Sequence, residues 1–316
     1  MKATHSDIVQ SHPWSIILAG GEGQRTRPFI ERWLGYHKPK QYCTFAGNRS
    51  LFQQTVDRAD VLSPTGRRVA VVAREYAVEA RAQLAGRPPG ILLAQPSNRG
   101  TAPGVLLGLA RIHAVDPNAV AIVYPSDHFV LPENGFIETV ARGAAAAASH
   151  PGKLILVGVE PETAELDYGW VQPGSRLDCE EAALFQVEAF VEKPSPDAGN
   201  AILARGGLWN SMVLIGKVGT FWKLAWRHVP EIMPRFARYR DAIGTARESA
   251  VLDRIYETMP TRDFSKDVLQ EASDELAVLP LEGVLWSDWG RPERIVETLR
   301  SIGQEPAFSE EYVLAG

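Results

Sequence analysis

The sequence predicts an α/β fold in which a mixed, mostly parallel sheet carries helices on both of its faces. Two observations support this prediction. Short apolar runs alternate with segments of helical periodicity through the first half of the chain, which is typical of parallel sheets. These runs are apolar at consecutive positions, so both faces of each strand are expected to be buried. The 316 residues are 22% charged and 45% hydrophobic, an ordinary globular composition.

The first half of the chain supplies these strands and helices in turn. Ser50 is expected to cap the helix that follows it, and Thr101 to cap a helix whose Val105, Leu109 and Ile112 form one stripe. Helices are also expected at residues 75–84 and 133–149, and the Ser50 helix runs to residue 62. Strands are expected at residues 14–18, 68–73, 91–95, 119–124 and 153–160.

The second half is less regular. We expect a loop or lid over residues 161–175 and a hairpin over residues 275–286. Two further strands, which extend the sheet, are expected at residues 183–193 and 208–217, and helices at residues 217–228, 231–241, 248–258 and 292–302. Residues 14–302 are expected to form one domain with halves at 14–160 and 161–302, between a flexible stretch at 1–13 and a tail at 303–316.

Composition argues against several classes of protein. Lys and Arg number 33 against 38 Asp and Glu, a net charge of −5, which makes the chain a poor binder of nucleic acid or of anionic membranes. The two cysteines, Cys43 and Cys179, match neither a zinc motif nor a secreted disulfide framework. No apolar run approaches the roughly 18 residues of a spanning helix, and the start lacks an apolar signal segment. We therefore expect a soluble cytoplasmic protein.

The loop after the first strand has the composition of a phosphate site. Ligands of parallel sheets bind where the carboxyl ends of strands meet the loops, here after Leu18, Gln95 and Tyr124. The segment 21–41 holds five basic and two acidic residues, and glycines at its start let backbone N–H groups approach phosphate oxygens. Thr26 stands where a dinucleotide fingerprint needs a third glycine, and no P-loop pattern occurs, so both of these motifs are excluded.

At this point the sequence resembles the sugar-1-phosphate nucleotidylyltransferases, and within them most closely the mannose-1-phosphate guanylyltransferases. The resemblance extends in order over about residues 14–300. A single motif is short, but the ordered set is highly specific. It consists of LAGGEGQR (18–25), PKQY (39–42), QPSNRGTAP (95–103), YPSDH (124–128), DYGWV (167–171), FVEKP (190–194), LWNSM (208–212) and WSDWG (286–290).

The resemblance implies a three-layer, Rossmann-like fold of the nucleotide-diphospho-sugar transferase type. The half at 14–160 would bind the nucleotide and the half at 161–302 the sugar phosphate. The implied reaction joins mannose 1-phosphate to GTP and gives GDP-mannose and pyrophosphate, with Mg²⁺, or Mn²⁺ in its place, as cofactor. GTP and a sugar 1-phosphate are then the partners, with a homodimer as the assembly to test. We expect no C-terminal β-helix and no fused isomerase domain.

The resemblance also assigns the catalytic residues. Arg25 falls on the family's signature arginine and is expected to hold the β- and γ-phosphates, and Lys40 on its lysine, which stabilises charge at the α-phosphate. Asp127 follows a buried strand, and the resemblance pairs it with Asp288 on the metal ion. Nucleotidyl transfer needs no covalent protein nucleophile, so positioning and charge neutralisation must carry the catalysis.

The binding residues follow in the same way. The loop around Gln95 is expected to recognise base and ribose, and that around Glu192 the sugar phosphate. The expected nucleotide-binding residues are Leu18, Ala19, Gly20, Gly21, Gly23, Arg25, Gln95, Arg99, Gly100, Thr101, Ser126 and Asp127. The expected sugar-phosphate residues are Tyr168, Gly169, Glu192, Lys193 and Asn210.

Departures from the family pattern keep alternatives open. Glu22 and Gln24 replace hydroxyl residues of the phosphate loop, the lid before Lys40 is longer, and Ser265 and Lys266 replace an Asp and a Tyr. The alternatives are the same chemistry with another hexose 1-phosphate or base, and a regulatory relative that binds nucleotide sugar without turnover. A glycosyltransferase is disfavoured because the chain has no Asp-x-Asp motif.

Overall fold

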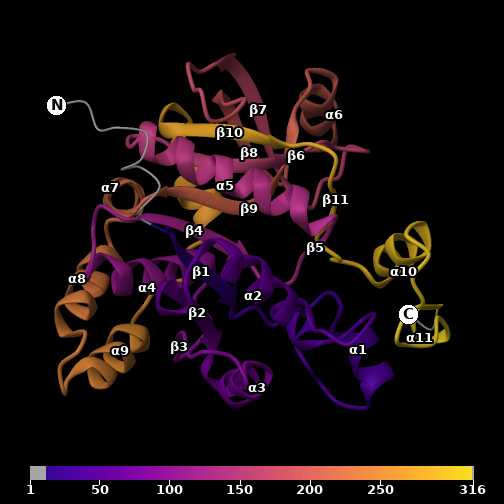
Figure 1. Cartoon of the computed structure of the whole chain (residues 1–316), viewed down its shortest axis with the longest axis horizontal. Coiled ribbons are helices and arrows are strands. Elements are labelled where there is room, and N and C mark those ends of the chain that lie inside the picture. The colour runs from indigo at the N-terminus through magenta and orange to yellow at the C-terminus, as the bar shows by residue number, and fades with distance from the viewer. Residues whose placement is uncertain (1–11, 315–316) are drawn as a thin grey trace.

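The computed structural model describes residues 12–314 and contains a nine-stranded sheet with the strand order β3-β2-β1-β4-β9-β6-β10-β8-β7 (Figure 1). The predicted α/β class is confirmed. A two-stranded sheet pairs β5 (Phe129–Leu131) with β11 (Leu285–Ser287). The nine strands are β1 (Trp14–Ala19), β2 (Arg68–Ala73), β3 (Ile91–Gln95), β4 (Val120–Pro125), β6 (Leu154–Val159), β7 (Gly169–Arg176), β8 (Phe185–Glu192), β9 (Leu208–Lys217) and β10 (Leu276–Leu281).

The nine-stranded sheet is mixed, with both parallel and antiparallel pairs. The pairs β3–β2, β2–β1 and β1–β4 are parallel, and so is β6–β10. The pairs that involve β9 or β8 are antiparallel, so these two strands run against the other seven. The carboxyl ends of β1 and β4 therefore lie side by side at one edge, which is where such sheets bind ligands.

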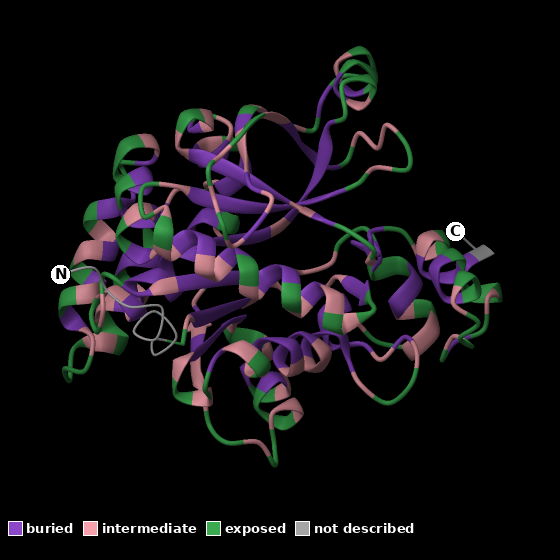
Figure 2. Ribbon diagram, turned by 45° about the horizontal axis from the view of Figure 1, so that its top comes forward, coloured by how far each residue is buried: buried purple, intermediate pink, exposed green. Residues whose placement is uncertain are grey.

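Helices cover both faces of the sheet, as predicted. Ile16 and Ile17 are adjacent in β1 and both fully buried, but Ile16 belongs to the core under α4, α7, α8 and α9 and Ile17 to the core under α2, α3, α5 and α6. Figure 2 shows the buried strands enclosed between the helices. These helices are α2 (Leu51–Leu62), α3 (Ala77–Gln83), α4 (Thr101–His113), α5 (Glu133–Ser149), α6 (Pro196–Ala204), α7 (Val218–His228), α8 (Met233–Ala242) and α9 (Glu248–Glu257).

A third core lies beside the sheet, where α1 (Arg27–Leu34), α10 (Pro292–Ser301) and α11 (Glu311–Leu314) gather at one end of the molecule (Figure 1). Phe29, Phe45 and Phe308 pack there with Trp289, whose ring stacks on Phe129 at 4.7 Å. The tail at 303–314 thus contributes Phe308 to this core. The prediction of a flexible stretch at 1–13 falls mostly on residues 1–11, which lie outside the described residues.

Most predicted elements are found within two residues of their expected ends. The hairpin at 275–286 is wrong. Pro280 and Gly283 are typical of a turn, but β10 pairs in parallel with β6, and β11 pairs with β5. Local sequence cannot distinguish two strands that pair with each other from two that each find a distant partner.

Two further predictions need correction. The loop at 161–175 ends at residue 168, because β7 begins at Gly169 and pairs with β8 and β9. The lid before Lys40, for which the sequence predicts no helix, contains α1, which has Pro28 in its first turn and is capped by Gly35. Thr101 is not the helix cap: Gly100 holds the cap position of α4, and the Thr101 hydroxyl bonds to the Asp263 carboxylate and the Phe264 N–H.

Across residues 12–314, every helix is too short or too polar to cross a lipid bilayer.

Gly100 provides a test of the packing at the start of α4. Its φ is +86°, and a Cβ there would lie 2.3 Å from the Arg262 carbonyl oxygen. Gly86 has a similar φ of +80° but open space around it. We expect Gly86→Ala to cost about 1 kcal/mol, from backbone strain alone, and Gly100→Ala about 3 kcal/mol, from strain and overpacking together. Urea unfolding measures the free energy of unfolding of both variants. Equal losses would show that the close approach of residue 100 to Arg262 adds nothing to the cost.

Candidate functional site

A cavity of about 200 Å³ opens at the carboxyl ends of β1 and β4. The glycine loop that follows β1 forms one wall and Asp127, two residues after β4, forms another. Lys40 enters from a short 3₁₀ turn at Lys40–Tyr42, and Gly290 from the loop after β11. The cavity is lined by Gly23, Gln24, Arg25, Thr26, Lys40, Asp127 and Gly290. Residues far apart in the sequence, all from the predicted motifs or next to them, therefore share one cavity.

Lys40 joins the two predicted metal ligands. Its side chain is 5% exposed, and its Nζ lies 2.9 Å from Asp127 Oδ2 and donates to the Asp288 carbonyl oxygen at 2.5 Å. Burial by itself would raise the pKa of Asp127, but the Lys40 ammonium and His128 outweigh it, and the pKa lies below its usual value. Lys40 therefore lies between the two aspartates rather than in solvent.

Asp288 is the most heavily bonded carboxylate of the site. Tyr168, Arg294 and the Gly290 N–H donate to its Oδ1 atom, and Arg25 donates to Oδ2 at 3.2 Å. Burial opposes ionisation, yet Lys40, Tyr168 and the Gly290 N–H hold the pKa of Asp288 well below its usual range. A Cβ at Gly290 would lie 2.3 Å from Oδ2, so only glycine fits beside this carboxylate.

The glycine loop is held by its backbone oxygens. Leu18 O accepts a hydrogen bond from the Ser126 hydroxyl at 2.7 Å, and Ala19 O accepts from Tyr42 and Gln41 at 3.1 Å. Gln41 also donates to Gly21 O at 2.8 Å. These contacts place the predicted residues Leu18, Ala19, Gly20, Gly21, Gly23 and Ser126 around one loop. The PKQY motif thus shapes the glycine loop as well as supplying Lys40.

The predicted base-recognition loop lies beside this glycine loop. Gln95 is 7% exposed, donates to the Tyr256 hydroxyl at 3.1 Å, and lies so close to Gly20 that a Cβ there would be 2.7 Å from its Oε1. Arg99 and Gly100 follow, and the Arg99 carbonyl accepts the Arg262 N–H at 3.0 Å. The segment Arg262–Phe264 therefore anchors the start of α4, a contact that the sequence did not indicate.

The predicted sugar-phosphate residues separate into two groups. A Cβ at Gly169 would lie 2.6 Å from Glu192 Oε2 and 3.5 Å from Asn210 Cβ, so these three residues face one another. Lys193 follows Glu192 with a φ of +49°, the left-handed region that non-glycine residues rarely adopt. The Tyr168 side chain instead bonds to Asp288, next to the cavity.

Glu192 has an unusual environment. Burial, reinforced by the negative charge of Asp263, raises the pKa of its carboxyl to about 7, although Lys193 opposes the rise. Its backbone N–H donates to Gln270 Oε1 at 3.0 Å. Gln270 ends the altered segment 264–270, whose residues 265–269 form a π-helix. Such turns are frequent at functional sites.

Several residues of the site were missed from sequence. Glu165 and Arg294 form an ion pair at 2.5 Å behind Asp288, and Asp167 pairs with Arg25 at 3.2 Å. Met212 adopts a φ of +59°, and the Ser265 hydroxyl lies 3.2 Å from its sulfur. Asp167 stood inside a recognised motif and could have been suspected; Arg294 carried no signal, because one Arg in a helix is ordinarily a solvated charge.

The donors of this cavity fit the magnesium ion that the family resemblance implies. Mg²⁺ prefers oxygen ligands and is commonly held by one or two carboxylates together with substrate phosphates. The low pKa values of Asp127 and Asp288 keep both carboxylates ionised at neutral pH. Asp288 Oδ2 has a half-exposed arginine as its partner, a contact that is easily exchanged.

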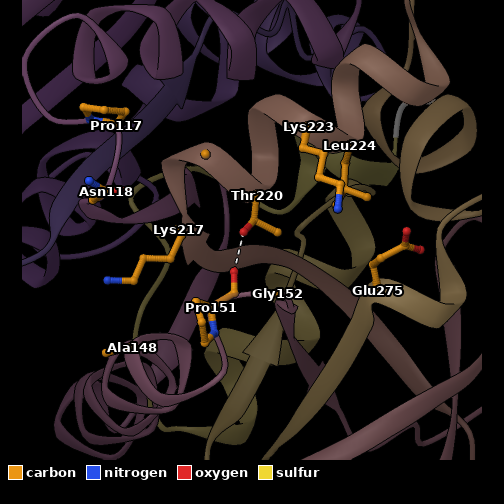
Figure 3. Close-up of a pocket in the computed structure, with 11 residues that line it drawn as sticks. Pro117, Asn118, Ala148, Pro151, Gly152, Lys217, Thr220, Lys223, Leu224 and Glu275 are labelled. Carbon is orange, nitrogen blue, oxygen red and sulfur yellow. Dashed lines mark hydrogen bonds between the residues drawn. The ribbon is translucent and has the colours of Figure 1, made fainter.

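A larger cavity of about 660 Å³ lies away from this site, near the start of α7 (Figure 3). Lys217 stands at the end of β9 opposite to Asn210 and lines this cavity with Lys223 and Thr220. None of the predicted site residues lines it. Volume therefore does not identify the functional site here; the convergence of charged motifs does.

Comparisons with known proteins bear on the family of the chain. The mannose-1-phosphate guanylyltransferase of Salmonella montevideo is 31% identical over 292 residues, which cover 87% of this chain and 57% of that protein. The xanthan biosynthesis protein XanB of Xanthomonas campestris pv. campestris (strain B100) is 29% identical over 303 residues, 92% of this chain and 60% of that protein. The chain thus spans less than two thirds of the length of these relatives.

The fold has a solved counterpart. The crystal structure of a mannose-1-phosphate geranyltransferase from Thermus thermophilus matches with a TM-score of 0.76 and 27% identity, over 90% of this chain and 79% of that one. The Salmonella montevideo relative carries the name mannose-1-phosphate guanylyltransferase, which confirms the resemblance to that family. Residues 14–305 match the nucleotidyl transferase family as a whole, and the chain belongs to that family.

Proposed function

We propose that this chain joins mannose 1-phosphate to GTP, giving GDP-mannose and pyrophosphate with the help of Mg²⁺. One observation carries the proposal: Arg25, Lys40 and Asp127, from three separate segments, line one small cavity. Asp288, from a fourth segment, contacts both Arg25 and Lys40 there. A reaction between two phosphate anions requires this combination of cations, backbone donors and metal-binding carboxylates.

The residues would divide the reaction between them. The glycine loop receives the triphosphate, and Arg25, half-exposed at the rim of the cavity, contacts the β- and γ-phosphates. Lys40, held by Asp127 and by the Asp288 backbone, places its charge against the α-phosphate. Asp127 and Asp288 would hold the ion, which would supply positive charge against the phosphate oxygens. The oxygen of the sugar 1-phosphate then attacks the α-phosphorus as pyrophosphate leaves in line.

The sugar is assigned in this proposal to the group of residues around Glu192. Gly169, Glu192 and Asn210 face one another there and offer a carboxylate and an amide to hydroxyl groups. Lys193 follows Glu192 and would reach the sugar phosphate. Gln95, Arg99 and Thr101 line the start of α4, on the nucleotide side. Guanine and mannose are proposed because a relative carries those names.

The first test compares substrates directly. The purified protein is incubated with mannose 1-phosphate, Mg²⁺ and each of GTP, ATP, UTP and CTP, and pyrophosphate release is measured. We expect release that depends on the sugar 1-phosphate and is fastest with GTP. Fastest release with a different triphosphate would change the assigned base. Release with glucose 1-phosphate but not with mannose 1-phosphate would change the assigned sugar. Binding without any release would instead indicate the regulatory relative.

A second prediction concerns Lys40. Lys40→Ala removes the cation between the two aspartates, so we expect kcat/KM to fall at least tenfold, which corresponds to ~1.4 kcal/mol of activation free energy. Lys38→Ala is the matched control, because Lys38 lies in the same segment and pairs with Glu79 at 2.9 Å. The control is expected to stay within twofold. Equal rates in the Lys40 variant and the wild-type protein would remove Lys40 from the mechanism.

A third prediction follows from Glu192. Because the pKa of its carboxyl is raised to about 7, the side chain gains a proton as the pH falls from 8 to 6 and ceases to be an anionic acceptor. We expect KM for mannose 1-phosphate to rise about threefold to tenfold over that range. In Glu192→Gln the substrate phosphate still titrates, but the side chain at position 192 does not. The part of the rise in KM that is due to Glu192 should therefore disappear. Parallel pH profiles for both proteins would contradict the role of Glu192.

A further inference from the structure

The two oxygens of the Asp288 carboxylate have very different surroundings. Oδ1 accepts three hydrogen bonds: from the Tyr168 hydroxyl at 2.7 Å, from the Gly290 N–H at 2.8 Å and from Arg294 Nη1 at 2.6 Å. Oδ2 accepts one, from Arg25 at 3.2 Å. Oδ1 is therefore occupied by three protein donors, whereas Oδ2 lies next to Arg25 and Gly290, two residues that line the cavity.

Arg294 is fixed more firmly than an arginine at a helix start usually is. Its other guanidinium nitrogen bonds to Glu165 Oε2 at 2.5 Å, and its guanidinium lies 5.2 Å from the centre of the Tyr168 ring. Nη1 also contacts the Tyr168 hydroxyl. The side chain is 22% exposed and that of Glu165 13%. A planar guanidinium between two carboxylates and a ring leaves Arg294 little freedom to rotate.

Arg25 contrasts with Arg294 in all these respects. Its side chain is 54% exposed, and each of its two contacts, with Asp167 and with Asp288, measures 3.2 Å. The pair with Asp167 is exposed on both sides and therefore weak, and in the pair with Asp288 the arginine is exposed although the aspartate is buried. Asp288 is thus held by one permanent arginine on Oδ1 and by one replaceable arginine on Oδ2.

We propose that Arg294 is a positioning residue: fixed by Glu165 and Tyr168, it holds Oδ1 of Asp288 so that Oδ2 alone is presented to the cavity. A carboxylate that could rotate would offer either oxygen, or both, to a cation. With Oδ1 occupied, Asp288 binds through one oxygen, in one orientation, once a triphosphate draws Arg25 away. The inference rests on the proposed function only in taking this cavity as the place of the nucleotide and its cation.

The test measures cation binding without turnover. Mn²⁺ is titrated into the protein that is saturated with guanosine 5′-(α,β-methylene)triphosphate, an analogue that cannot release pyrophosphate, and free Mn²⁺ is followed by electron paramagnetic resonance. Affinity for the analogue alone is measured in EDTA. For Arg294→Gln we expect the Kd for Mn²⁺ to rise at least tenfold while the Kd for the analogue in EDTA stays within threefold.

Three variants accompany this measurement. Arg291→Gln is the matched control, because Arg291 pairs with the same Glu165 at 3.1 Å and otherwise with Asp167. Its Kd for Mn²⁺ should stay within twofold of the wild-type value. Arg294→Lys keeps one donor and should recover part of the loss. Tyr168→Phe removes one hydrogen bond to Oδ1 and should weaken Mn²⁺ binding about threefold; it decides the question if Arg294→Gln does not fold.

The outcomes separate this inference from the proposed function. If Arg294→Gln binds Mn²⁺ as tightly as the wild-type protein, the positioning role is overturned even if the protein releases pyrophosphate. The role is also overturned if the variant loses affinity for the analogue in EDTA by the same factor as it loses affinity for Mn²⁺. The same holds for unchanged Mn²⁺ affinity in Tyr168→Phe. If the protein releases no pyrophosphate from any triphosphate but shows the expected pattern of Mn²⁺ affinities, the proposed reaction is wrong and the inference about Arg294 stands. Absence of analogue-assisted Mn²⁺ binding in the wild-type protein would overturn the inference.

Discussion

The site depends on one buried ammonium group. Lys40 Nζ contacts Asp127 Oδ2 and the carbonyl oxygen of Asp288, and so joins the turn Lys40–Tyr42 to the segments that follow β4 and β11. A buried charge without partners is unstable. The position of each aspartate is therefore tied to that of the lysine. Charged groups that are fixed before substrate arrives need little reorganisation during the reaction.

The start of β7 serves two parts of the site at once. Gly169, the first residue of β7, faces Glu192 and Asn210, which belong to the proposed sugar region. Tyr168, which directly precedes the strand, bonds instead to Asp288 beside the cavity. Two adjacent residues of the motif DYGWV therefore contact two different parts of the candidate site.

The sequence allowed most strands, most helices and the convergence of Lys40 with Asp127 to be predicted, because periodicity and ordered motifs are local signals. It failed where tertiary pairing decides. β10 and β11 resembled a hairpin, yet each pairs with a distant strand. Thr101 resembled a cap, yet it bonds to residues 263 and 264. The role of Arg294 depends on contacts with residues more than 120 positions away, which no local pattern encodes.

Trp289 links the reaction centre to the far end of the chain. It stands between Asp288 and Gly290 with a φ of +44°, a conformation that costs a non-glycine residue about 1–3 kcal/mol. Its ring is clamped by Phe129 and Phe45, and Phe45 in turn packs on Phe308 and accepts a backbone hydrogen bond from Ala307. Phe308, which lies beyond α10, thus supports the aromatic packing around Trp289 and so helps to hold the strained backbone next to Asp288.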